Sequence, residues 1–186
     1  MAYLFDPDRL EQLTKPLAGL PHHELVRQLP DVLAQAYPGH IDPRPRPLFN
    51  VAGGAAGMMY VLHGSLSEYL ILFGTPIGTE GYSGRFTAEI HDLVLLGEMW
   101  TYTEEHPGEH VTSRPGDHAV LRVGQAKGWA ARPGTWMLEY GRGFIPGTLP
   151  IALSDVLIGA CDVITVARTF WTYGRLIARE LLQGKL

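Results

Sequence analysis

The sequence predicts an α+β fold, with a β-rich centre between helical segments at both ends of the chain. The 186 residues are 46% hydrophobic and only 18% charged, a composition that forms a packed core rather than a disordered chain. Turn motifs built on Gly and Pro cluster between residues 78 and 134 and separate short β-branched and aromatic runs. Towards both ends of the chain, apolar residues recur at helical spacing. At this length we expect a single domain, residues 1–186.

The N-terminal segment, residues 1–47, is predicted to be helical. Leu25, Leu29 and Leu33 follow one another at intervals of four residues, and the Pro-Gly pair at residues 38–39 ends the pattern. The alternating prolines that follow form a stiff, extended linker. Charged residues are frequent among the first twenty, so we expect neither a signal peptide nor a transmembrane helix there.

The central zone, residues 48–145, is predicted to be a β-sandwich or a small β-barrel. Its runs are short and bounded by turn residues, as in all-β domains. Residues 58–73 are apolar with Ser and His inserted, and periodicity alone does not decide between a helix and a buried strand. The predicted turns lie at residues 78–81, 107–108, 115–116 and 133–134.

Residues 86–96 are the most informative run of this zone. As a strand they place Ile90 and Val94 on one face, with Asp92 in the middle of that face. Burying a carboxylate is unfavourable unless it is paired, hydrogen-bonded or protonated. A buried Asp92 therefore indicates a partner for its charge, or a function. Glu139 is a second carboxylate in a strand-like run between large apolar residues.

These two carboxylates are the candidate catalytic pair. If Asp92 and Glu139 share one apolar cavity, they do not both ionise cheaply, and one pKa rises. Such a pair can give a proton to one side of a bound hydrocarbon and accept one on the other. It can also hold a cation such as a protonated amine. The alternative is that one or both form surface salt bridges, and alternation along the strand leaves all of these open.

The C-terminal zone, residues 146–186, is predicted to be helical throughout. Its first half is strongly apolar and includes Cys161, which we expect to be a buried, inert thiol. In the second half Arg168, Arg175 and Arg179 form a basic stripe opposite apolar residues. A basic amphipathic helix beside an apolar one suits a membrane surface, and the alternative is a helical hairpin packed on the β-rich centre.

Other polar or glycine-rich features favour structural interpretations. His63 and Glu68 are expected to satisfy buried backbone groups. The glycine-rich residues 53–57 lack the Lys-Ser/Thr of a phosphate loop, so they are expected to permit close packing. The 15 Lys and Arg are scattered and the net charge is −4, which argues against a nucleic-acid partner. Five residues near Pro-Gly turns are expected to be solvated rather than to hold a metal: His106, Glu109, His110, Asp117 and His118.

Several segments of the chain resemble the family of the sigma-1 receptor and the fungal C-8 sterol isomerase. The resemblance extends over about residues 21–182, and runs of this length in this order are specific. The segments that carry it are residues 63–75 (HGSLSEYLILFGT), 81–85 (GYSGR), 88–92 (AEIHD) and 135–143 (TWMLEYGRG), together with residues 38–40, 145–146 and the C-terminal helices.

The resemblance implies a cupin-like β-barrel around an elongated apolar pocket, without a metal or other cofactor. It implies two C-terminal helices that lie on a membrane surface and gate the pocket, and a homotrimer with Gly53 and Gly57 near the subunit contact. Asp92 and Glu139 match the two pocket acids, with a hydrogen bond from Asp92 to Glu139. The ligand-binding residues it implies are Met59, Tyr69, Phe73, Ile90, Ile145, Thr148, Leu149, Ala152 and Tyr173.

The leading interpretation is a sterol-type isomerase that shifts a ring double bond from C-8 to C-7, with Asp92 and Glu139 as acid and base in an unassigned order. The rival is a non-catalytic binder of sterols, lipids or cationic amphiphilic amines. A third alternative is a metal-dependent cupin enzyme that uses the histidine cluster of residues 106–118. The protein is expected to be a peripheral membrane protein on the cytoplasmic side of a membrane.

Overall fold

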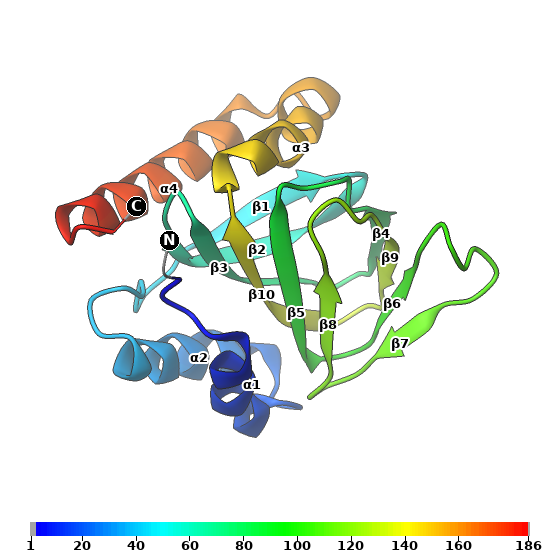
Figure 1. Cartoon of the computed structure of the whole chain (residues 1–186), viewed down its shortest axis with the longest axis horizontal. Coiled ribbons are helices and arrows are strands. Elements are labelled where there is room, and N and C mark those ends of the chain that lie inside the picture. Colours follow the sequence, from blue (N-terminus) through cyan, green and yellow to red (C-terminus); the bar gives the residue numbers. More distant parts are fainter. Residues whose placement is uncertain (1–2, 186) are drawn as a thin grey trace.

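The computed structural model describes residues 3–185, in which ten antiparallel strands form two sheets between helices at either end (Figure 1). One sheet has the order β1-β2-β3-β10-β5-β8 and the other the order β4-β9-β6-β7. The sheets curve around one interior without closing, so the expected α+β, cupin-like barrel is confirmed as an open barrel. The strands are β1 (Pro47–Ala52), β2 (Ala55–Gly64), β3 (Glu68–Thr75), β4 (Thr79–Tyr82), β5 (Ala88–Leu96), β6 (Met99–Tyr102), β7 (Val111–Ser113), β8 (His118–Leu121), β9 (Gly128–Ala131) and β10 (Thr135–Gly143).

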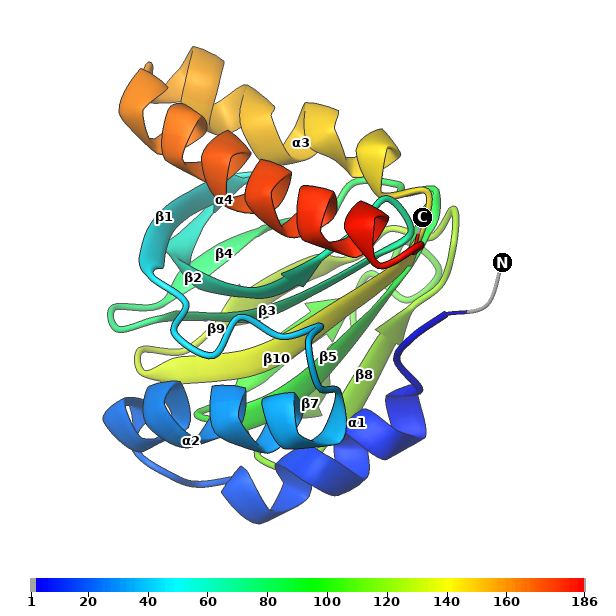
Figure 2. The same cartoon turned by 90° about the vertical axis from the view of Figure 1, so that its left-hand side faces the viewer.

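The helices cover opposite sides of this barrel (Figure 2). Helices α1 (Pro7–Thr14) and α2 (His22–Ala36) lie against the outer face of the six-stranded sheet, and α3 (Leu149–Ser154) and α4 (Val163–Leu182) lie over the other side. The helix expected from the leucine spacing is therefore confirmed as α2. Among residues 3–185, no helix is long and apolar enough to cross a membrane.

The two faces of the six-stranded sheet belong to two separate apolar clusters. On β10, Leu138 and Tyr140 point outward and pack against the N-terminal helices. Met137, on the same strand, points inward with Ile90 and Val94 of β5. Alternate residues of one strand thus serve two cores, and the inward set lines the interior of the barrel.

This arrangement settles the undecided residues 58–73. They form the second part of β2 and most of β3, two antiparallel strands joined by a tight connection. All eight residues of β3 are buried, because one face packs on α2 and the other lines the interior. A strand buried on both faces lacks polar alternation, which is why the sequence pattern did not distinguish it from a helix.

The C-terminal zone contains the two expected helices, and a break separates them. A π-helical turn, Asp155–Gly159, follows α3, and α4 begins only after Asp162, whose side chain accepts a hydrogen bond of 2.9 Å from the backbone N–H of Thr165. Cys161 lies in the break with a positive φ of 53° and is exposed. The expectation of a buried thiol was therefore wrong, because the helix breaks at this point.

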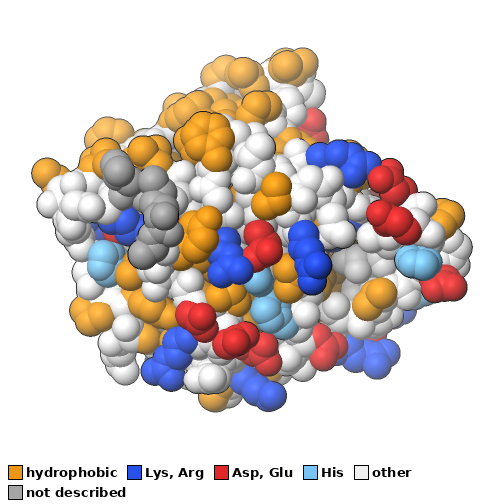
Figure 3. All heavy atoms as spheres, in the orientation of Figure 1, with side chains coloured by type: hydrophobic (Ala, Val, Ile, Leu, Met, Phe, Trp, Pro, Cys, Tyr) orange, Lys and Arg blue, Asp and Glu red, His pale blue; other side chains and the backbone are white. Residues whose placement is uncertain are grey.

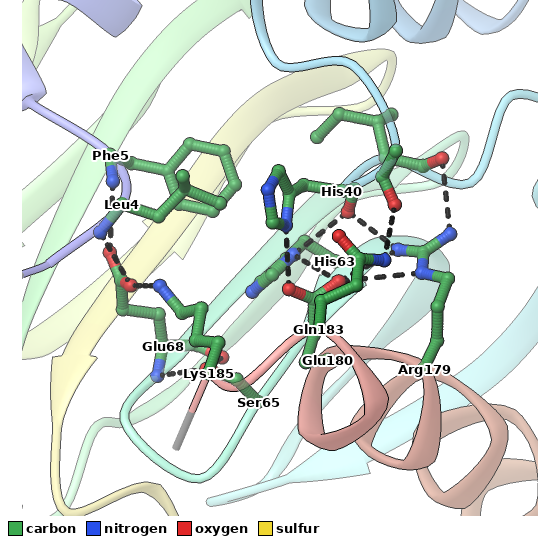
Figure 4. Close-up of polar contacts among 12 residues, drawn as sticks. Leu4, Phe5, His40, His63, Ser65, Glu68, Arg179, Glu180, Gln183 and Lys185 are labelled. Atoms are coloured by element: carbon green, nitrogen blue, oxygen red, sulfur yellow. Dashed lines mark hydrogen bonds and ion pairs between the residues drawn. The ribbon is translucent and has the colours of Figure 1, made fainter.

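A buried polar network fixes the end of α4 to the barrel (Figure 4). Glu180, fully buried, contacts Nδ1 of His40 at 2.7 Å, and Arg179 donates to the carbonyl oxygen of His40 at 2.6 Å. His63 Nδ1 also donates to the carbonyl of His40, at 2.8 Å, so its expected role with backbone groups is confirmed. Burial lowers the pKa of His63 to about 4, which keeps the ring neutral.

Glu68 connects three parts of the chain in the same region (Figure 4). Its carboxylate accepts hydrogen bonds from the backbone N–H groups of Leu4 and Phe5, at 2.8 and 3.1 Å, and from the hydroxyl of Tyr140 at 2.7 Å. The ammonium of Lys185 forms an ion pair with it. The expectation that Glu68 satisfies backbone groups is therefore confirmed.

Candidate ligand-binding and acid–base site

An apolar cavity of about 300 Å³ occupies the interior of the barrel. Strands of both sheets form its walls, and residues of α3 and α4, among them Ala152 and Tyr173, form its roof. All nine residues that the family resemblance implies for ligand binding lie along this cavity. They are Met59, Tyr69, Phe73, Ile90, Ile145, Thr148, Leu149, Ala152 and Tyr173. Their role in binding a ligand stays a prediction.

The two predicted acids face each other across neighbouring strands of the cavity wall. Asp92 of β5 and Glu139 of β10 are directly opposed in the antiparallel ladder. Opposed residues point to the same side of a sheet, with Cβ atoms about 4.5–5.5 Å apart. Both carboxyl groups therefore lie on one wall of the cavity, and Asp92 is only 3% exposed. Because they share a wall, they reach the same face of a flat ligand rather than its two sides.

Each acid has its own hydrogen-bond donor. Lys127, in the segment leading into β9, forms a buried ion pair with Asp92. The hydroxyl of Tyr69 donates to Oε1 of Glu139 at 2.6 Å. The resemblance implied a direct hydrogen bond from Asp92 to Glu139; among residues 3–185 none joins them, and Oδ2 of Asp92 is paired with Lys127 instead.

Glu139 is held in a state that favours a proton. Burial, and next the negative charge of Asp92, raise the pKa of Glu139 to about 7, against the lowering effects of the Tyr69 hydrogen bond and the Lys127 charge. Gly141 makes the Tyr69 contact possible, because a Cβ at residue 141 would lie 2.2 Å from the Tyr69 ring. The wall thus carries one ion-paired carboxylate and one carboxyl group that is half protonated near neutral pH. Two acids in different protonation states are what paired acid–base chemistry requires.

Lys127 is the main site residue that the sequence analysis missed. It stands between small residues in a short segment, and its inward direction depends on the pairing of Tyr82 with Gly128. Its side chain is 11% exposed. The one available signal is that the chain has only three lysines, with this one in an apolar neighbourhood. Trp129 also lines the cavity, beside Phe73, with ring centroids 5.9 Å apart.

The histidine cluster does not form a site. His106, Glu109 and His110 are exposed in the connection between β6 and β7. His118 instead contacts His91 Nδ1 at 2.9 Å, and Asp117 accepts from the backbone N–H of Arg114 at 2.8 Å. Within residues 3–185, no three His, Cys, Asp or Glu side chains gather where they could hold a metal ion.

The fold and the cavity define a class of protein: an open β-barrel with an apolar pocket, a carboxylate pair on the pocket wall and a helical roof. Within that class, the chain belongs to the family described as "ERG2 and Sigma1 receptor like protein", whose family model matches residues 1–185. The resemblance noted in the sequence is therefore confirmed.

Curated relatives include both branches of this family. The chain is 40% identical over 180 residues to the sigma non-opioid intracellular receptor 1 of Gallus gallus, covering 96% of this chain and 81% of the relative. It is 38% identical over 189 residues to the C-8 sterol isomerase ERG2 of Gibberella zeae, covering 99% and 79%. A predicted oxalate decarboxylase from Thermotoga maritima is similar to 53% of this chain and 93% of its own, with 14% identity and a TM-score of 0.44.

Proposed function

We propose that the chain is an isomerase that shifts a ring double bond, C-8 to C-7, in a sterol-type lipid held in the barrel. The observation that supports this most is the opposition of Asp92 and Glu139 on one wall of an apolar cavity, one ion-paired and the other with a raised pKa. The C-8 sterol isomerase ERG2 of Gibberella zeae is among the curated relatives.

The reaction needs only proton transfer. Glu139 gives its proton to one carbon of the ring double bond, whose electron pair forms the new C–H bond and leaves a cation on the neighbouring carbon. The carboxylate of Glu139 that results stands beside this cation and stabilises it. Asp92 removes a proton from the next ring carbon, and the electrons of that C–H bond form the new double bond. Atoms and electrons balance without a cofactor.

The pH dependence of the reaction tests the role of Glu139. As a proton donor it is active when protonated, so we expect kcat/KM for a ring-unsaturated sterol to be level below pH about 7 and to fall tenfold per pH unit above it. Tyr69→Phe removes a hydrogen bond that stabilises the carboxylate, so its midpoint should move to higher pH. A flat profile from pH 5 to 9 in protein that converts the sterol would contradict the assignment.

The second candidate is a non-catalytic binder of hydrophobic ligands. The observation that favours it is the 40% identity to a receptor over 96% of the chain. In that case the same cavity binds a ring-unsaturated sterol and returns it unchanged. Analysis of the sterol recovered after incubation with the protein separates the two candidates.

We also infer that the roof of the cavity is the part that meets a membrane. Large apolar side chains of the π-helical turn and α4 are exposed, including Ile158 at 77% and Trp171 at 76%. On the face shown in Figure 3, hydrophobic side chains gather over the side of the molecule that carries α3 and α4. Of the basic stripe, Arg175 pairs with Asp42 and Arg179 donates to backbone carbonyls, while Arg168 is exposed. The homotrimer and the cytoplasmic side stay predictions from the resemblance.

Vesicle binding tests this surface. Ile164→Ser with Trp171→Ser removes two exposed apolar side chains from one face of α4, so we expect co-sedimentation with phosphatidylcholine vesicles to weaken by about tenfold or more. Ile77→Ser is the control, since Ile77 is 84% exposed in the turn between β3 and β4. Equal loss in both variants, or none in either, would contradict the assignment of the roof.

A further inference from the structure

The cavity contains a cation of its own. The ammonium of Lys127 lies inside it, paired with Asp92. The backbone of Lys127 is fixed twice by Ser83, just after β4: its N–H donates to Ser83 Oγ at 2.9 Å, and its carbonyl accepts from the Ser83 N–H at 2.9 Å. The position of this charge is therefore built into the barrel.

The charges of Asp92 and Lys127 on the cavity wall cancel each other. Asp92 contributes −1 and Lys127 contributes +1, and Glu139 contributes nothing when it carries its proton. A ligand ammonium placed here meets the like charge of Lys127, the Asp92 carboxylate is already paired, and Glu139 balances the ligand only by giving up its proton. Moving an unbalanced charge from water into an apolar cavity is strongly unfavourable.

The ammonium of Lys127 can also donate hydrogen bonds to a ligand. It carries three N–H groups, and among residues 3–185 its hydrogen-bond partner is Asp92. The other N–H groups require an acceptor, which a hydroxyl or carbonyl oxygen provides and a protonated amine does not.

We propose that Lys127 sets the charge selectivity of this cavity, so that it takes uncharged, oxygen-bearing lipids and rejects cationic amphiphiles. This rests on the proposed function only in treating the cavity as the ligand site. Lys127 acts here as a selectivity residue, and its effect is expected in ligand affinity whether or not the ligand is converted.

The wild-type protein gives the first test. Decan-1-ol and decylamine have the same chain length and differ in charge at pH 6. Calorimetric titration should show the alcohol binding at least about tenfold more tightly than the amine. An amine that binds as tightly as the alcohol, or more tightly, would overturn the proposal.

Removal of the cation gives the second test. Lys127→Met keeps the length of the side chain and frees the Asp92 carboxylate, so decylamine affinity should rise by about 10- to 100-fold. The double variant Asp92→Asn/Lys127→Met removes both charges and should lose this gain. Lys15→Met, the same change at an exposed site, should leave both affinities unchanged.

The outcomes separate this proposal from the isomerase. If Lys127→Met does not fold, the comparison of the two ligands can still be made in the wild type and in the double variant. Neither of these proteins contains an unpaired buried charge. Amine affinity that is equal in wild type and Lys127→Met would overturn the role of Lys127 alone. Selectivity that is intact in a protein that does not convert the sterol would overturn the isomerase alone.

Discussion

Replacing Glu139 with Gln should lower the rate of double-bond migration by about 100- to 10,000-fold, the usual contribution of a positioned general acid. The amide keeps the shape of the carboxyl group but has no proton of suitable acidity to give. Near neutral pH the native group is half protonated, so the change neither buries nor frees a full charge. We therefore expect the affinity for an uncharged sterol to stay within about threefold.

Asp92→Asn should cost about as much as Glu139→Gln, and the double variant little more than either, because the two acids act as one unit. Glu89→Gln is the matched control: Glu89 lies on the same strand, β5, but on its other face, paired with Arg142. Sterol conversion measured by chromatography gives these rates. A Glu139→Gln variant that retains more than a tenth of the wild-type rate would rule out Glu139 as the acid.

The largest effect on stability is expected for Glu68→Ala, which should lower the free energy of unfolding by about 3–5 kcal/mol. The variant leaves Lys185 without its carboxylate and leaves the Leu4 and Phe5 N–H groups without an acceptor (Figure 4). The Tyr140 hydroxyl loses its bond to Glu68 and keeps only the carbonyl oxygen of Phe5, at 3.0 Å. Burial raises the pKa of Glu68, but the hydrogen bonds from Leu4, Lys185, Tyr140 and Phe5 outweigh it and lower the pKa overall. The native state therefore depends on the ionised group.

Urea denaturation measures this loss. Glu104→Ala is the control, because Glu104 pairs with Arg85 where both side chains are exposed, and such pairs contribute less than about 1 kcal/mol. If Glu68→Ala stayed within about 1 kcal/mol of the wild type, the proposed tie between the N-terminal segment, β10 and the C-terminal end would be wrong.

The sequence predicted the parts of the site that follow from local alternation. Residues 88–95 alternate between the two faces of β5, one of which packs on the N-terminal helices while the other lines the cavity. The inward direction of Asp92 could therefore be inferred from parity alone. The opposition of Glu139 to Asp92 depends on the register between β5 and β10, which the alternation does not contain. The family resemblance supplied that pairing.

Other features depended on contacts between distant segments. Lys127 points inward because β9 pairs with β4, and no periodic pattern surrounds it. The basic stripe of α4 has helical periodicity, and the sequence does not show that Asp42 and the carbonyls of residues 40–41 engage part of it. The break at Cys161 occurs in an apolar run that favours a helix locally, and the hydrogen bond of Asp155 to the Gly54 N–H draws the preceding turn onto the β1–β2 connection.

The central claim, proton exchange at a ring double bond by acids on one wall, is tested most directly in deuterated water. Wild-type protein is incubated with a ring-unsaturated sterol, and the product is analysed by mass spectrometry and NMR. The account predicts one deuterium in each molecule of isomerised sterol, at the carbon that Glu139 protonates and on the ring face from which the other proton leaves. Bound sterol recovered without a shifted double bond and without deuterium would contradict it.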